Sequence, residues 1–231
     1  MSNYTTKTTM NMKTRTRNLK DRMLRAAMLL LAVMTTATTW ADSVTVTSQT
    51  TSWASGNTYN VTSNVTIGSR ITVTGDVTLI IADGATLTAS KGITIADGFT
   101  LTIEGSGTLI ATGENGRHGQ DGLLSGKPGG DGTDGICGNI IVNGATVHAT
   151  GGDGGDGENT TYDFGEGGSG GAGGAGISSD VTFNSGIVIA TGGAGGSGGS
   201  GSGGLMGSDG SDGAAGKGIG GTVDCANGAL A

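Results

Sequence analysis

The residues of this chain that could do chemistry are mainly aspartates set in glycine-rich segments. Residues 129–137 match the nonapeptide pattern of calcium-binding β-rolls, and residues 151–156 match it in part, with Glu158 at the apolar place. Calcium prefers carboxylate oxygens. The candidate metal ligands are therefore Asp131, Asp134, Asp153 and Asp156. Glycine already recurs here every third residue, so we keep calcium as an alternative and expect no other cofactor.

Enzymatic chemistry needs a different arrangement, such as paired carboxylates at a fixed separation or a base beside a nucleophile. Asp76, Asp83 and Asp97 instead fall where the pattern predicts turns. His118 lies in a glycine segment and His148 points outward from a predicted strand. No Ser-His-Asp or Cys-His grouping is suggested, and we predict that the protein is not an enzyme.

The elements that carry these residues are defined by the phase of glycine. Nine glycines occur at every third position from Gly192 to Gly216, and shorter runs precede them. A three-residue polyproline-II-type helix presents each third residue on one face, whereas a flexible linker has no faces. The runs predict three insertions, at 113–135, 151–176 and 192–218, each folded back as a hairpin. Disordered glycine loops are the competing interpretation, and collagen is rejected because Pro128 is the only proline.

Between and before the insertions, short β-branched strands alternate aliphatic residues with threonine. Isoleucine opens repeat units of about 22 residues, and later units contain about 20 more residues, which are the glycine insertions. The fold class is therefore all-β: a right-handed parallel β-helix with glycine-rich, polyglycine- or polyproline-II-like hairpin insertions. We expect N-terminal solenoid coils over 42–112 and coils carrying the three insertions over 113–231.

The turns of the predicted hairpins are candidate binding surfaces, because loops displayed on a rigid scaffold commonly carry function. Their aromatic and apolar residues are Leu123, Leu124, Tyr162, Phe164, Leu205 and Met206. The alternative is that these residues only cover the end of the bundle.

Residues 1–41 have the pattern of a secretory signal peptide, with a basic stretch, a short apolar run and Ala41 at the expected cleavage site. An uncleaved anchor or a disordered tail is the alternative. Cleavage would leave 18 acidic and 5 basic residues, which argues against nucleic acid as a partner and against anionic membrane surfaces. We expect a secreted or cell-surface protein with no membrane span after signal removal.

Two cysteines, Cys137 and Cys225, occur in this exported chain. The repeat alignment places them about two coils apart at different positions of the repeat, beyond the reach of a disulfide. We predict that both are unpaired and that Cys225 is a core residue.

Residues 69–93 resemble a repeat of largely uncharacterised secreted or surface proteins of gut Bacteroidetes, which look like right-handed parallel β-helices. The resemblance covers about residues 50–112 well and the later repeats loosely. The phased glycines resemble the polyglycine-II bundles of snow-flea antifreeze proteins and of phage tail-fibre tip adhesins. Neither resemblance transfers a functional residue. The chain ends early in a further repeat, as a shortened relative of larger surface proteins would.

We therefore expect a non-enzymatic structural or adhesive module whose partner is an extracellular glycan or a surface protein. The alternatives are an ice-binding protein, a calcium-binding glycine-rich protein and a degenerate polysaccharide-active β-helix. Ice binding is suggested by threonine pairs at 72/74, 86/88 and 100/102. Their 14-residue spacing does not fit a 22-residue coil, however, and threonine is an ordinary outward residue of exposed strands.

Overall fold

Alternating aliphatic and threonine residues form β-strands through the described chain, which comprises residues 42–120, 122, 125–160, 164–202 and 207–225 of the computed structural model. Every regular element in these ranges is a strand, which confirms the all-β class. The strands are β1 (Asp42–Thr45), β2 (Ser52–Trp53), β3 (Asn57–Val61), β4 (Val65–Ile67), β5 (Ile71–Val73), β6 (Val77–Ile81), β7 (Thr86–Ala89), β8 (Ile93–Ile95), β9 (Thr100–Gly105), β10 (Thr108–Thr112), β11 (Ile136–Cys137), β12 (Asn139–Thr150), β13 (Val181–Thr191) and β14 (Val223–Cys225).

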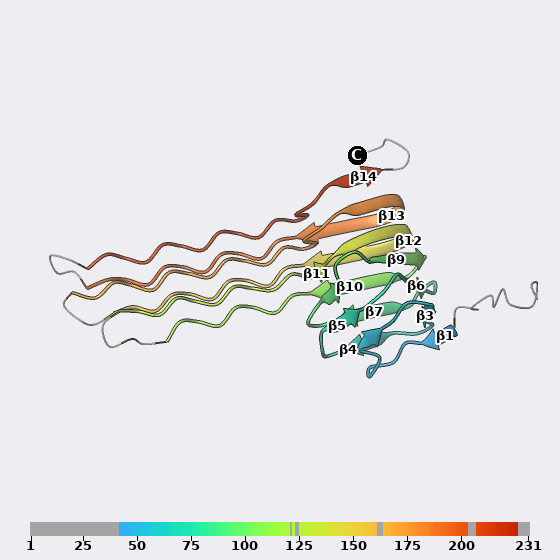
Figure 1. Ribbon diagram of the computed structural model, residues 1–231, viewed down its shortest axis with the longest axis horizontal. Coiled ribbons are helices and arrows are strands. Elements are labelled where there is room, and N and C mark those ends of the chain that lie inside the picture. The colour runs from blue at the N-terminus through green and yellow to red at the C-terminus, as the bar shows by residue number, and fades with distance from the viewer. Residues whose placement is uncertain (1–41, 121, 123–124, 161–163, 203–206, 226–231) are drawn as a thin grey trace, which may run out of the picture. The chain divides into compact units, whose positions relative to one another are not determined.

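The strands pair in parallel in two sheets, and the larger sheet is curled (Figure 1). Its order is β1-β3-β6-β9-β12-β10-β7-β4, with β13 between β12 and β14, while the smaller sheet runs β11-β8-β5-β2. The long strand β12 joins the two halves of the larger sheet. Its first part, from Asn139 to Asn143, pairs with β9, and its last part, from Thr146 to Thr150, pairs with β10.

The register confirms the predicted repeat. Val65 pairs with Leu87 and Leu87 with Leu109, so these two steps along the chain are equal in length. Leu109 then pairs with Val147 and Val147 with Val188, and each of these steps spans a glycine insertion as well as a repeat. The additional residues are accommodated outside the sheets. A column of paired isoleucines shows the same steps, short where no insertion intervenes and longer across each glycine insertion: Ile71, Ile93, Ile136, Ile177 and Ile219.

The core lies between the sheets and is built from the inward-facing member of each alternating pair. In β6 the burial alternates along the strand, and Leu79 and Ile81 are fully buried. Full burial of such a side chain contributes about 1.5–3 kcal/mol. Near the first strands, Trp53 is fully buried and stacks on Tyr59 with ring centroids 5.1 Å apart. The indole N–H of Trp53 donates to the Thr50 carbonyl at 3.0 Å, so its polar atom is satisfied as well.

Threonines on the outward face stack on threonines of neighbouring strands. Thr86 pairs with Thr108 and Thr108 with Thr146. Thr112 pairs with Thr150 in a parallel column. The spacing of the threonine pairs along the chain was therefore the wrong quantity to compare. The offset between paired strands decides which residues meet.

Both cysteines are free, and both are only partly buried. Cys137 lies in the smaller sheet opposite Thr94, whereas Cys225 lies in the larger sheet opposite Phe183. The prediction that Cys225 belongs to the core was wrong. It lies in β14, which pairs only with β13 among the described strands, and the neighbouring Val223 is 41% exposed.

Three hairpins leave the sheets, between β10 and β11, between β12 and Ile177, and between β13 and Ile219 (Figure 1). We call them hairpins 1, 2 and 3, and each has an outgoing and a return arm. In hairpin 1 the arms are residues 113–120 and 126–135. In hairpin 2 they are residues 151–160 and 164–176, and in hairpin 3 they are residues 192–202 and 207–218. They contain no strand, yet they run side by side and are hydrogen-bonded to one another.

Candidate functional site: the bundle of glycine hairpins

Each triplet of an arm distributes its main-chain N–H groups among different neighbours. In the outgoing arm of hairpin 2, Gly154 donates to the Ala194 carbonyl of hairpin 3 at 2.8 Å. The next residue, Gly155, donates to the Gly130 carbonyl of hairpin 1, also at 2.8 Å. Backbone amides need partners when they are buried. Here, arms that have no internal hydrogen bonds supply those partners to one another.

Glycine is required where two arms meet. Gly171 is buried in the return arm of hairpin 2, and a β-carbon there would collide with the Gly130 carbonyl oxygen. A β-carbon on Gly154 would collide in the same way with the carbonyl oxygen of Gly171. At both positions the contact would be closer than 3.0 Å, which real β-carbons essentially never show. The threefold phase of glycine therefore marks the faces on which backbones touch.

The third residue of the triplet faces outward, and its side chain provides an acceptor for the next hairpin. Each of the four predicted metal ligands uses Oδ1 to accept a main-chain N–H from the residue 41 positions later. Asp131 accepts from Ala172 at 2.8 Å, Asp134 from Ala175 at 2.7 Å, Asp153 from Ala194 at 2.7 Å and Asp156 from Ser197 at 2.8 Å. These bonds satisfy amides that no neighbouring carbonyl reaches.

The four aspartates are thus divided between two arms. Asp131 and Asp134 lie on the return arm of hairpin 1, and Asp153 and Asp156 lie on the outgoing arm of hairpin 2. Within the described ranges, no three His, Cys, Asp or Glu side chains form a group that could hold a metal ion. Calcium binding by these four residues stays a prediction, and their hydrogen bonds give each of them a structural role.

His118 has a similar position in hairpin 1. Its Nδ1 accepts the Asp156 N–H at 3.2 Å and lies 3.4 Å from Oδ2 of the same residue. His118 therefore contacts hairpin 2 at Asp156, as Asn115 does at the amide of Asp153. His148 lies in β12 and is partly buried.

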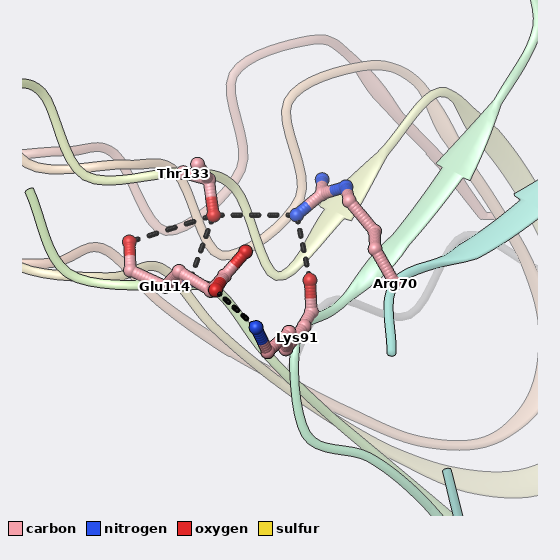
Figure 2. Close-up of polar contacts among 4 residues, drawn as sticks. All are labelled: Arg70, Lys91, Glu114 and Thr133. Atoms are coloured by element: carbon pink, nitrogen blue, oxygen red, sulfur yellow. Dashed lines mark hydrogen bonds and ion pairs between the residues drawn. The ribbon is translucent and has the colours of Figure 1, made fainter. Parts of the chain in front are cut away.

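The base of hairpin 1 is held by Arg70, which precedes β5 (Figure 2). Its guanidinium donates to the carbonyls of Lys91 at 2.8 Å and Asp134 at 3.1 Å, and to the Thr133 hydroxyl at 3.2 Å. The Thr133 hydroxyl also accepts the Glu114 N–H at 2.7 Å. Arg70 therefore links the strand region to the return arm of the hairpin, and Thr133 extends this link to the outgoing arm.

Lys91 and Glu114 complete this group. The Lys91 ammonium lies 2.8 Å from Oε1 of Glu114, in an exposed pair (Figure 2). Hydrogen bonding to Lys91 lowers the pKa of Glu114, and the nearby positive charges of Lys91, Arg70 and Arg117 act in the same direction. The arrangement positions the hairpin and brings no nucleophile or paired carboxylates together.

Of the predicted turn residues, Phe164 is described, and its side chain is 63% exposed. The other predicted binding residues lie outside the described residues: Leu123, Leu124, Tyr162, Leu205 and Met206. Phe164 begins the return arm of hairpin 2. A binding role for Phe164 stays a prediction.

Sequence reasoning missed side chains that join successive repeats in the strand region. Asp180, just before β13, accepts hydrogen bonds from the main-chain N–H and the hydroxyl of Thr222, at 2.7 and 2.9 Å. These bonds lower the pKa of Asp180. The amide of Asn184 donates to Asn143 at 2.7 Å. The sequence signal that could have revealed these contacts is a polar residue that recurs at the offset between successive hairpin-bearing repeats.

Comparison with known proteins identified no relative of this chain. No protein-family model, curated protein or solved structure matches the chain. Among the described residues, no helix has the length and apolar character that a membrane crossing requires.

Proposed function

We propose that this protein is a secreted or cell-surface, non-enzymatic module that uses a glycine-hairpin bundle as a rigid adhesive projection. In this proposal the strands form a right-handed parallel β-helix whose coil is the repeat unit of the sequence, and the arms are polyglycine-II-type helices. The observation that carries the proposal is the hydrogen bonding between hairpins, in which the amides of Gly154 and Gly155 are bound by two different neighbouring hairpins.

Hairpins that are ordered during folding lose less conformational entropy when a partner binds them. A free glycine loop loses about 1–2 kcal/mol per residue when a partner immobilises it. Arms that are already bonded to their neighbours have lost that freedom during folding, so less is lost on binding. A bundle of this kind presents its turns at a fixed spacing, and scaffolded loops of this kind are where binding residues concentrate.

The proposed partner is an extracellular glycan, with a surface protein as the alternative. Exposed Phe164 offers an aromatic face, and Tyr162, two positions earlier in the sequence, belongs to the same predicted turn. Aromatic rings supply a large apolar contact area, and tyrosine adds a polar group. The acidic composition of the exported chain makes neutral or basic partners more favourable than polyanions.

The test is a glycan array together with binding to whole cells, using the chain from Asp42 onwards. We expect a specific signal that falls at least about tenfold in the double variant Tyr162→Ala/Phe164→Ala, which corresponds to about 1.4 kcal/mol. Phe99→Ala is the matched control, because Phe99 is also an exposed phenylalanine, at 37%, but lies next to β9 in the strand region. No signal on either platform, or equal loss in the control, would contradict the proposal.

Export is part of the proposal and has its own measurement. Expression with residues 1–41 in a bacterial host that has a secretory pathway should release a mature protein whose N-terminal residue is Asp42. Intact-mass spectrometry of the exported fraction checks this directly. Retention of the leader in a membrane fraction would instead favour an N-terminal anchor.

Ice binding is a second candidate, favoured by the threonine columns of the larger sheet. Thr86, Thr108 and Thr146 stand opposite one another on consecutive paired strands, and so do Thr112 and Thr150. Strands are about 4.8 Å apart, so within each column these hydroxyl and methyl groups repeat regularly from strand to strand. Thermal hysteresis that disappears in Thr108→Lys would support this candidate, and its absence in the wild type would exclude it.

A further inference from the structure

The two outer edges of the hairpin bundle break the glycine pattern at the positions that would face another hairpin. In the return arm of hairpin 2, Gly167 and Gly170 face hairpin 3, and β-carbons there would collide with the carbonyl oxygens of Gly199 and Gly196. Return-arm glycines of hairpin 1 face hairpin 2 in the same way. Inside the bundle, this position is therefore restricted to glycine.

In hairpin 3 the corresponding residues are not glycine. Gly167 donates to the Ser208 carbonyl and Gly170 to the Ser211 carbonyl, which aligns the return arms of hairpins 2 and 3 in the same register as the paired strands β13 and β14. That correspondence places Asp209, Asp212 and Ala215 where hairpin 2 has glycines. If a further backbone approached closely on this side, its carbonyl oxygens would collide with the β-carbons of these three residues.

These aspartates also replace the acceptors that a further hairpin would supply. In hairpin 2, the outgoing-arm amide of Gly157 is bound by the Ser197 carbonyl of hairpin 3. In hairpin 3, the equivalent amide of Gly198 donates to Oδ1 of Asp212, and that of Gly201 to Oδ1 of Asp209, both at 2.8 Å. The carboxylates come from the return arm of the same hairpin.

The opposite edge, on hairpin 1, breaks the pattern as well. In hairpin 2, β-carbons at Gly152 and Gly155 would collide with the carbonyl oxygens of Glu114 and Arg117 in hairpin 1. In hairpin 1 itself, the corresponding positions are occupied by Glu114, Arg117 and Gln120, all of which are exposed. Hairpin 1 therefore carries long side chains on the face that would meet a preceding hairpin.

We infer that these side chains close the bundle at three hairpins and keep bundles of different molecules from joining edge to edge. The edges would otherwise be complementary, because main-chain hydrogen bonds join hairpin 1 to hairpin 2, and hairpin 2 to hairpin 3, in both directions. Open edges on hairpins 1 and 3 would therefore each offer N–H groups and carbonyls to the other. Proteins protect exposed sheet edges in a comparable way, by placing charged side chains on them.

The experiment opens one edge at a time in the chain from Asp42 onwards. The first variant, Asp209→Gly/Asp212→Gly/Ala215→Gly, opens hairpin 3. The second variant opens hairpin 1 and contains Glu114→Gly, Arg117→Gly and Gln120→Gly. Each variant alone has one open and one closed edge, so it should associate no more tightly than wild type. A one-to-one mixture should form a heterodimer at least about tenfold tighter in sedimentation velocity at about 0.5 M salt, where exposed charge pairs are screened.

The matched control is Glu166→Gly, which removes an exposed carboxylate from the return arm of hairpin 2 and should not associate with either edge variant. Association of the wild type through these edges, or a mixture no tighter than the wild type, would overturn the inference.

A second measurement is local and does not depend on assembly. Asp212→Ala should speed hydrogen exchange at Gly198 about five- to tenfold, whereas Asp212→Asn, which keeps an acceptor oxygen, should not. Equal exchange in both variants would overturn the capping role.

Discussion

Replacing Gly171 by alanine tests whether the hairpins are held together by close backbone contact. Its amide donates to the Gly155 carbonyl, and its carbonyl accepts from Gly196, both at 2.8 Å. An added β-carbon would collide with the Gly130 carbonyl oxygen, and ordinary contact begins at 3.4 Å. The Gly171 segment must then move roughly 1 Å or more away from Gly130, and this displacement takes both hydrogen bonds of Gly171 out of the usual range. Two bonds of about 0.5–1.5 kcal/mol each amount to a loss of about 1–3 kcal/mol.

Native-state hydrogen exchange measures this loss where it occurs, because arms and strands can open separately. We expect the protection of the Gly196 amide to fall roughly 5- to 150-fold in Gly171→Ala. Ser169→Ala is the control, since its outward position in the same arm already bears a β-carbon and Ala172 occupies the next such position. Its effect should stay within about twofold. Unchanged protection in Gly171→Ala would refute the argument that glycine is required by contact.

Three further predictions concern the strands and the base of hairpin 1. Trp53→Ala should lower the free energy of unfolding by about 3–5 kcal/mol in denaturant titration, because it removes a fully buried ring; a loss below about 1 kcal/mol would contradict this. The hydrogen bonds from Thr222 that lower the pKa of Asp180 stabilise the folded state above the ordinary carboxyl range near pH 4. This stabilisation should be lost as the pH falls through the lowered pKa of Asp180. Thr222 protection should therefore decrease at low pH in the wild type and be independent of pH in Asp180→Asn. Arg70→Lys cannot reproduce the several guanidinium contacts, so exchange at Thr133 should accelerate while exchange at Gly196 stays unchanged, and equal acceleration at both sites would argue against a local anchor.

The strand register was predictable from the sequence because core residues recur with the repeat. Ile93, Ile136, Ile177 and Ile219 were aligned from their glycine-isoleucine contexts, and they are paired in that order. A buried aliphatic column tolerates few residue types, so it leaves a periodic trace. Burial at the last repeat was less predictable, because Cys225 has a paired strand on one side only among the described residues.

The role of the aspartates was not predictable from the local motif. Asp131 and Asp153 were assigned to a calcium pattern because glycine surrounds them. Their hydrogen-bond partners, Ala172 and Ala194, lie far along the chain, in the next hairpin. Comparing each insertion with the next in that register would have shown an acidic residue opposite a small one. A short local motif cannot contain this information, because the contact joins different hairpins.

The threonine columns illustrate the same limit in the strands. Thr86 and Thr88 were compared with the next threonine pairs along the chain, whereas Thr86 lies opposite Thr108, one full repeat later. Spacing along the chain is informative only after the offset between neighbours is known. For this fold, that offset is the quantity to determine first.

The triplet geometry of the arms has a consequence for how the hairpins can change in length. Deleting one residue from an arm would rotate every later residue to a different side and put β-carbons against carbonyl oxygens. Insertions and deletions are therefore tolerable only as whole triplets, made together in the two arms of a hairpin so that they stay level. Each such step would move a turn by roughly 9 Å. The reach of each hairpin is thus adjustable in coarse increments, independently of the strands that carry it.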